Sequence, residues 1–267
     1  MSTQQIPASL VKQLRDETGA AMMDAKRALV ETDGDLEAAK RILRERGMAS
    51  AAKRADRATS EGIVLSSVSG HVGTLVAVGC ETEPVSKNAE FLAFAEKALE
   101  SVEAEGQDAV AGLDAGRTEL VSRLGENIVI VEAVRMEAGE GESLAEYVHP
   151  PANKIGVLVR LKGENPVAAR RLAMHVSFAR PLYRSREEIP AADVEAEREI
   201  YSKQPDVVSK PEHVREKIVE GMLQKRFFAE SVLSEQVWIH EPSKTVGQAL
   251  QEAGLEVLEF RRASVAG

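Results

Sequence analysis

The sequence has few of the residues that support disulfides, membrane spans or an aromatic core. It contains one cysteine, Cys80, which excludes a disulfide framework and favours a reducing compartment. Its N-terminus has neither the basic nor the apolar segment of a secretory signal, and no apolar run approaches the ~20 residues that cross a bilayer. Aromatic residues make up only 4%, so aliphatic side chains must build the core. These features predict a cytoplasmic protein with no membrane partner.

The charge balance is acidic, because 34 Lys and Arg residues stand against 43 Asp and Glu residues, a net charge of −9. Phosphate contacts need clustered basic side chains, so direct nucleic-acid binding is not expected. The most basic stretch, residues 40–57, is interpreted as a solvated helix face. The chain has 267 residues, which is enough for two or three domains.

Motifs for catalysis and ligand binding are missing from the sequence. It has no phosphate-binding loop, no H-E-x-x-H and no G-x-S-x-G. The five histidines have no metal-ligand spacing, so no metal and no other cofactor is predicted. Cys80 could be a thiol nucleophile, but Glu81 and Glu83 would oppose thiolate formation, and a small buried hydrophobe is the favoured interpretation. His175 lies in an apolar helical stretch, which favours a packing role over a catalytic one.

Hydrophobic spacing predicts three short helices within residues 8–47, with a capping turn before the third and a C-terminal stop at Gly47. Met22 and Met23 are adjacent in the second helix and cannot both face its core. One of them is therefore expected to be exposed or at an interface. Residues 49–61 have no large apolar side chain and are predicted to form a linker, part of it helical.

The rest of the chain alternates strands and helices in an order that occurs twice. Hairpins are predicted within residues 63–78 and 144–161, and a helix–Gly–strand joint follows later at Gly125 and again at Gly254. We infer a diverged duplication of an α+β unit with a small antiparallel sheet and helices on one face. Chance similarity between short β-segments is the alternative.

An insertion of two helices interrupts the second repeat, and narrow apolar seams predict that they form an antiparallel helical hairpin. Such hairpins usually dock onto a partner or a second copy. Ser209 and Glu212 have the spacing of a capping box at the start of its second helix. The predicted domains are a three-helix domain (1–48), a linker (49–61), a core N-subdomain (62–139), the first part of a core C-subdomain (140–187), the hairpin (188–228) and the completed C-subdomain with the C-terminus (229–267).

Several segments, in order along nearly the whole chain, resemble the signatures of the elongation factor Ts family. They are residues 10–15 with 18–24, 79–88, 125–128, 154–159, 173–176, 217–222 and 241–247. The sequence departs from the family at one point, where Glu83 and Pro84 replace the usual Asp-Phe of the core signature.

The resemblance implies an α+β fold with an N-terminal UBA-like three-helix domain, a duplicated core and an inserted helical hairpin. It implies a protein that is not an enzyme, binds elongation factor Tu carrying GDP and promotes GDP release. Whether the protein forms a homodimer or a 2:2 complex stays open. The residues implied as partner contacts are Lys12, Arg15, Met22, Met23, Lys26, Ile155, Gly156 and His175.

The resemblance also implies that a loop formed by Thr82, Glu83, Pro84 and Val85 disturbs the Mg²⁺ site of the partner GTPase. Proline has neither an aromatic ring nor an N–H, so this loop is expected to contribute less than in the family, and the N-terminal helices more. Two alternatives stay open. One is a binding-only paralogue that sequesters or chaperones the same GTPase, and the other is a thiol-dependent enzyme that uses Cys80.

Overall fold

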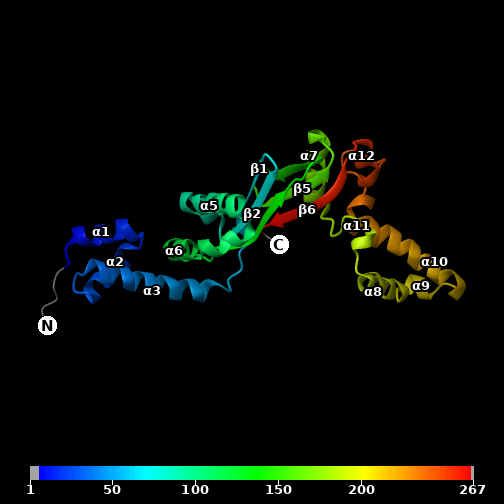
Figure 1. The fold of residues 1–267 in the computed structure, drawn as a ribbon. Helices are drawn as coiled ribbons and strands as arrows, with labels where there is room; N and C mark the ends of the chain where they lie inside the picture. Colours follow the sequence, from blue (N-terminus) through cyan, green and yellow to red (C-terminus); the bar gives the residue numbers. More distant parts are fainter. Residues whose placement is uncertain (1–5, 266–267) are drawn as a thin grey trace. The chain divides into compact units, whose positions relative to one another are not determined.

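The computed structural model describes residues 6–265 (Figure 1). It is an α+β structure whose strands form two small antiparallel sheets within these residues, with the strand orders β1-β2-β3 and β4-β5-β6. The chain divides into two compact units. The first contains the residues up to Leu65, Val76–Val134 and the residues from Ser264, and the second contains Ser66–Leu75 and Arg135–Ala263.

The N-terminal helices of the first unit are α1 (Ala8–Thr18), α2 (Met22–Glu31) and α3 (Leu36–Arg54). Their inward faces form a small buried cluster that includes Leu14 and Leu29. The predicted capping turn before the third helix is confirmed. There the Asp35 carboxylate accepts a hydrogen bond from the backbone N–H of Ala38 at 3.0 Å.

Gly47 does not end α3, contrary to the sequence prediction. The helix continues to Arg54, so that part of the predicted linker is helical. A Cβ at Gly47 would lie 2.8 Å from the Ser122 hydroxyl oxygen. The glycine therefore allows the helix that contains Ser122 to approach α3 closely and does not supply a left-handed helix stop.

The first sheet consists of β1 (Glu61–Ser69), β2 (Val72–Cys80) and β3 (Val129–Glu137). The elements between β2 and β3 are α4 (Glu83–Ser86), α5 (Ala89–Glu105), the 3-10 helix η1 (Gln107–Leu113) and α6 (Asp114–Leu124). As predicted, Gly125 ends α6 in the left-handed conformation.

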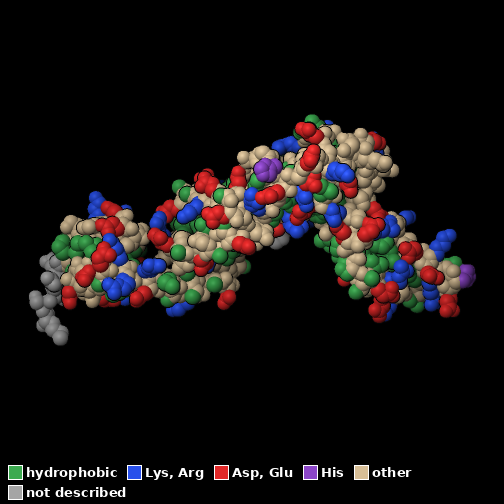
Figure 2. Space-filling view, in the orientation of Figure 1, with side chains coloured by type: hydrophobic (Ala, Val, Ile, Leu, Met, Phe, Trp, Pro, Cys, Tyr) green, Lys and Arg blue, Asp and Glu red, His purple; other side chains and the backbone are tan. Residues whose placement is uncertain are grey.

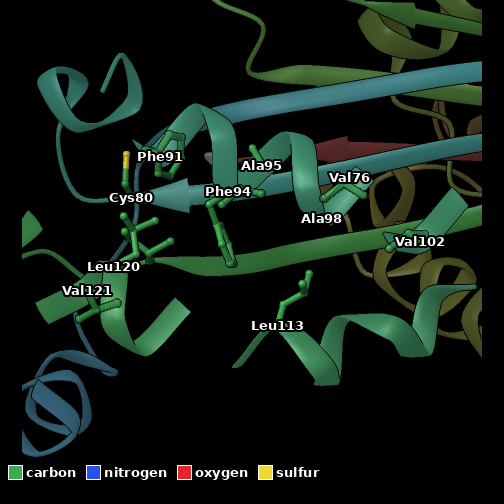
Figure 3. Close-up of a cluster of buried hydrophobic side chains, with 12 residues drawn as sticks. Val76, Cys80, Phe91, Phe94, Ala95, Ala98, Val102, Leu113, Leu120 and Val121 are labelled. Carbon is green, nitrogen blue, oxygen red and sulfur yellow. The ribbon is translucent and has the colours of Figure 1, made fainter. Parts of the chain in front are cut away.

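The core of the first unit lies between its sheet and these helices, and Figure 3 shows its buried side chains. Phe91 and Ala95 of α5 pack in one cluster with Val76 and Cys80 of β2. The helical spacing of the α5 residues and the strand position of the β2 residues thus bring one apolar face of each element together.

The second sheet consists of β4 (Glu142–Val148), β5 (Ile155–Lys162) and β6 (Glu256–Ser264). Strands β4 and β5 pair antiparallel, as the predicted hairpin requires. Helix α7 (Pro166–Ala179) packs against both strands, and α12 (Val246–Glu252) precedes β6.

The segment between α7 and α12 is mainly helical. It contains η2 (Arg186–Glu188), α8 (Ala191–Ser202), α9 (Pro205–Val208), α10 (Glu212–Met222), the π-helical turn η3 (Leu223–Phe228), α11 (Ala229–Ser231) and η4 (Leu233–Glu235). Helices α8 and α10 pack against each other through a cluster that includes Tyr201, Val219 and Leu223.

The predicted capping box at the start of α10 is wrong. Pro211 occupies the N-cap position, and α10 has no side-chain cap. The Ser209 hydroxyl instead donates to the backbone carbonyl of Asp206 at 3.1 Å. Residues 205–208 form the helical turn α9, and Ser209 is the C-cap of this turn.

Candidate partner-binding surface

Helix α1 places two basic side chains on its outer face. Val11 and Leu14 are buried, whereas Lys12 and Arg15, three residues apart, are exposed. Gly19 ends the helix in the left-handed conformation, and its N–H donates to the Arg15 carbonyl at 2.7 Å. Because α1 ends sharply at this glycine, only three residues separate α1 from α2.

Helix α2 presents an apolar and basic face to solvent. Ala25, Ala28 and Leu29 are buried, while Met22 is 47% exposed and Met23 is 63% exposed. Lys26 follows on the same outer face and is exposed. The sequence predicted at least one exposed methionine, and both are. Figure 2 shows hydrophobic side chains exposed beside charged ones on the N-terminal helices.

Exposed methionine suits a surface that must adapt to another protein. Its thioether is flexible and polarisable, and methionine is enriched in protein–protein interfaces. Lysine adds a positive charge that can steer an acidic partner. The outer face of α2 therefore has the chemistry of a protein-binding surface.

Thr82, Glu83, Pro84 and Val85 do not form the loop that the sequence predicted. Residues 83–86 make one helical turn, α4, and Thr82 is its N-cap. Pro84 favours this conformation, because its fixed φ suits the first turn of a helix, where a missing N–H costs little. The first three residues are exposed, and Val85 packs against the core of the first unit.

The outer side of α4 carries an ion pair. The Lys87 ammonium lies 2.6 Å from the Glu83 carboxylate in an i,i+4 arrangement. The hydrogen bond to Glu83 raises the pKa of Lys87. Both side chains are exposed, so the pair orients the Glu83 carboxylate more than it stabilises the fold.

Cys80 is fully buried at the end of β2. Figure 3 shows its thiol among the core side chains, near Phe91 and Leu120. The thiol donates to the Thr82 carbonyl at 3.4 Å. These contacts confirm a packing role and leave the thiol no access to a substrate.

The three candidate residues of the second unit lie on β5 and α7. Ile155 and Gly156 begin β5, and Gly156 is buried opposite Val148 of β4. His175 lies on α7 and is fully buried. Its side chain therefore has no exposed surface for a partner, and any part in binding is indirect.

His175 is held by polar and aromatic contacts. Its Nε2 lies 2.9 Å from the Gln236 side-chain oxygen, and its Nδ1 accepts from the Ile239 N–H at 3.4 Å. Its ring stacks on the Trp238 indole with the ring centroids 5.2 Å apart. Burial lowers the pKa of His175, and the hydrogen bond to Gln236 opposes that shift. The predicted packing role of this histidine is confirmed.

Sequence reasoning missed the residues that hold these sites in place. Gln236 and Trp238 anchor His175, and Trp238 is the only tryptophan of the chain, a signal that could have identified it. Glu126 binds the start of α4 through its carboxylate. In the sequence, Glu126 is distinguished only as part of a family signature.

No group of three or more His, Cys, Asp or Glu residues could hold a metal ion in the part of the chain that the structure describes. Over the same residues, no helix is both long and apolar enough to cross a membrane.

The fold and these surfaces define a class: an α+β protein whose short N-terminal helices suit it to bind another protein.

Residues 81–267 match the family model described as "Elongation factor TS". Proteins named elongation factor Ts are similar over nearly the whole chain. The one from Alkalilimnicola ehrlichii is 41% identical over 97% of this chain and 92% of its own length, and the one from Psychromonas ingrahamii is 43% identical over 97% and 90%. The protein from Escherichia coli strain HS is 40% identical over 98% of this chain and 92% of its own length.

The chain belongs to the elongation factor Ts family, a family of translation elongation factors. The resemblance found in the sequence signatures is confirmed.

Proposed function

We propose that this chain is a guanine-nucleotide exchange factor that binds elongation factor Tu carrying GDP and promotes GDP release during translation elongation. Family membership over 97% of the chain is the observation that carries the proposal. The proposed action needs no cofactor and no covalent step, so the protein is not an enzyme in the chemical sense. Its place of action is the cytoplasm.

The domain boundaries predicted from the sequence remain part of this proposal. Helices α1 to α3 are assigned to the UBA-like domain, within residues 1–48 and the start of the 49–61 linker. Helices α8 to α10 are assigned to the inserted hairpin, residues 188–228. The core subdomains then comprise residues 62–139, 140–187 and 229–267.

Thermodynamic linkage explains how binding alone can release a nucleotide. If the factor binds the empty GTPase more tightly than the GDP-bound one, the factor must weaken the binding of GDP to the GTPase by the same ratio. A thousandfold mutual weakening corresponds to about 4 kcal/mol. That free energy must come from contacts that form only with the opened GTPase.

The exposed side chains divide into two proposed roles. Lys12, Arg15, Met22, Met23 and Lys26 supply binding energy through the outer faces of α1 and α2. The exposed turn at Thr82, Glu83 and Pro84, together with Val85, disturbs the Mg²⁺ site of the GTPase.

Three candidate residues of the second unit complete the proposed contacts. Ile155 and Gly156 act at the start of β5. His175 acts through its neighbours, because its own ring is buried.

A GDP-release assay tests the proposal directly. Elongation factor Tu is loaded with a fluorescent GDP, and an excess of unlabelled GDP is added with or without the purified chain. Release should accelerate with the concentration of the chain and then saturate. Release at the intrinsic rate over the whole concentration range would contradict the proposal.

One observation favours the binding-only alternative. Pro84 sits within a helical turn and has no aromatic ring that could wedge between partner side chains. A binding-only paralogue would form a complex with elongation factor Tu, as detected by gel filtration, and yet leave the GDP-release rate unchanged. The same samples therefore separate the two functions.

A further inference from the structure

The joint between α6 and β3 runs beside the joint between β2 and α4. The first joint contains Glu126 and Asn127, and the second contains Glu81 and Thr82. Residues 125–128 match a family signature, yet none of the proposed contacts uses them. What this segment touches is the start of the turn that carries Glu83 and Pro84.

The Glu126 carboxylate accepts three hydrogen bonds from that start. One oxygen, Oε2, accepts from the backbone N–H of Glu81 at 3.1 Å and from that of Thr82 at 3.0 Å. The other oxygen, Oε1, accepts from the Thr82 hydroxyl. Hydrogen bonds to an ionised carboxylate are stronger than those between neutral groups. Glu126 thus binds both the backbone and the side chain of the residue that caps α4.

A second carboxylate makes the contact reciprocal. The Glu81 carboxylate accepts a hydrogen bond from the backbone N–H of Asn127 at 2.6 Å. Backbone N–H groups of each joint thus donate to a carboxylate of the other joint. Asn127 is itself buried, and its amide donates to the carbonyls of Ala55 and Arg57 at 3.2 and 2.8 Å. These bonds leave both joints with little freedom to shift along the sheet.

Helix α4 needs such an anchor because it is only four residues long. A helix this short is not stable by itself, and its position depends on what holds its ends. Its N-cap residue, Thr82, makes no side-chain capping hydrogen bond to α4, and its hydroxyl donates to Glu126. The far end is held by Asn88, which caps α5 through the Glu90 N–H at 2.8 Å.

We propose that Glu126 is a positioning residue for nucleotide release, fixing the turn of Thr82, Glu83 and Pro84 in the orientation that reaches the nucleotide site of the GTPase. This inference rests on the proposed exchange function. A turn that is already fixed loses no conformational freedom when it meets the opened GTPase. A loosened turn would bind less well in that state, and GDP release would slow.

The positioning role makes a prediction that a merely structural role does not. The three hydrogen bonds of Glu126 go to residues 81 and 82, whereas the outer face of α2 is proposed to supply binding energy. Loss of Glu126 should therefore lower the maximal GDP-release rate at saturating concentration of the chain. It should change the concentration that gives half of the maximal rate much less.

Three variants test the role. Glu126→Ala removes all three hydrogen bonds, whereas Glu126→Gln keeps the side-chain length, one carbonyl acceptor and an amide that can donate to Thr82. Glu142→Ala is the matched control, because Glu142 accepts from the Gly139 N–H at 2.9 Å and from Arg160 at the second sheet. The control thus removes a carboxylate that, like Glu126, accepts a hydrogen bond from a backbone N–H, but at a different place.

Glu126→Ala should lower the saturating rate of fluorescent-GDP release by about tenfold or more, the effect expected when charge-assisted hydrogen bonds are lost. The half-saturating concentration should change by less than about threefold, and Glu126→Gln should recover most of the rate. Glu142→Ala should release GDP at the wild-type rate. Hydrogen exchange, followed by mass spectrometry, should show faster exchange at residues 81–82 in Glu126→Ala alone.

An unchanged saturating rate in Glu126→Ala would overturn the inference, and so would an equal loss in Glu142→Ala. A variant that changes only the half-saturating concentration would overturn it as well. If the wild-type chain itself does not accelerate release, the proposed function fails and this role falls with it. The wild-type trace therefore shows which of the two ideas is at fault.

Discussion

The two units place their candidate binding residues in opposite ways. In the first unit, Met22, Met23 and Lys26 project from an exposed helix face. In the second unit, His175 is enclosed by Gln236 and Trp238 and has no exposed surface. The comparison teaches that a sequence signature does not distinguish a residue that contacts a partner from one that holds the contacting surface in place.

The largest expected effect is on the folding of the second unit. His175→Ala would remove a fully buried ring and leave the Gln236 amide oxygen without its hydrogen-bond donor. We expect a loss of about 2–4 kcal/mol in the free energy of unfolding, measured by urea denaturation. Met23→Ala is the control and should stay within about 0.5 kcal/mol of wild type. Equal losses of unfolding free energy in the two variants would contradict the difference in burial between His175 and Met23.

The next effect is on binding through the first unit. Met22→Ala combined with Met23→Ala should weaken the complex with nucleotide-free elongation factor Tu by tenfold to a hundredfold, or about 1.4–2.8 kcal/mol. The urea midpoint should not change, because both side chains are exposed in the free protein. Titration calorimetry measures the affinity.

Met48→Ala is the matched control for this surface, since Met48 is 56% exposed on α3 and is not among the candidate contacts. It should bind like wild type. If Met48→Ala weakened the complex as much as the double variant, exposed methionine in general, and not the face of α2, would explain the loss.

The free energy of unfolding should also depend on pH, and this effect is smaller. The pKa of His175 is lowered in the folded state from its ordinary value of 6.5. Above about pH 6.5 neither state is protonated, and the histidine has no effect on the pH dependence of stability. Below that pH the unfolded chain binds the proton first. Stability should therefore fall by up to about 1.4 kcal/mol per pH unit until the folded pKa is reached.

Urea denaturation at pH 7.5 and at pH 5.5 measures this dependence. His213→Gln is a suitable control, because His213 is exposed on α10. The stability of His213→Gln should depend on pH as strongly as that of the wild type, whereas His175→Gln should lose most of this dependence. A His175→Gln variant with the wild-type pH dependence would exclude His175 as its source.

The smallest effect concerns the turn at α4. Pro84→Phe restores the aromatic ring that the family usually has and should raise the saturating GDP-release rate by about threefold, or roughly 0.7 kcal/mol. Pro84→Ala is the control for loss of the proline ring alone and should not exceed the wild-type rate. An unchanged or slower rate in Pro84→Phe would show that the missing ring does not limit exchange.

Much of the fold could be predicted because local signals agreed with tertiary structure. The cap at Asp35, the glycine stop at Gly125 and the paired strands β4 and β5 all follow from short-range chemistry. In each case the local pattern and the core favour the same conformation.

The errors arose where a distant contact or a neighbouring turn decided the outcome. Gly47 resembles a helix stop, but α6 approaches at that glycine and the helix continues. Ser209 resembles a cap for α10, but α9 uses it. Residues 82–85 resemble a loop, whereas Pro84 and the Glu126 contact favour a helical turn.

The candidate site was predictable only in part for the same reason. Periodicity placed at least one methionine of α2 at the surface, because exposure follows from position on the helix. It could not identify Glu126 as the partner of Thr82, since 44 residues separate them and only the folded sheet brings them together.

The proposed exchange function requires that this protein bind the empty form of its GTPase more tightly than the GDP-bound form. Titration calorimetry of elongation factor Tu, first stripped of nucleotide with a chelator and then saturated with GDP and Mg²⁺, measures the two affinities. We expect an affinity at least about a hundredfold higher for the empty form, a difference of about 2.8 kcal/mol. Equal affinities for the two forms would contradict it.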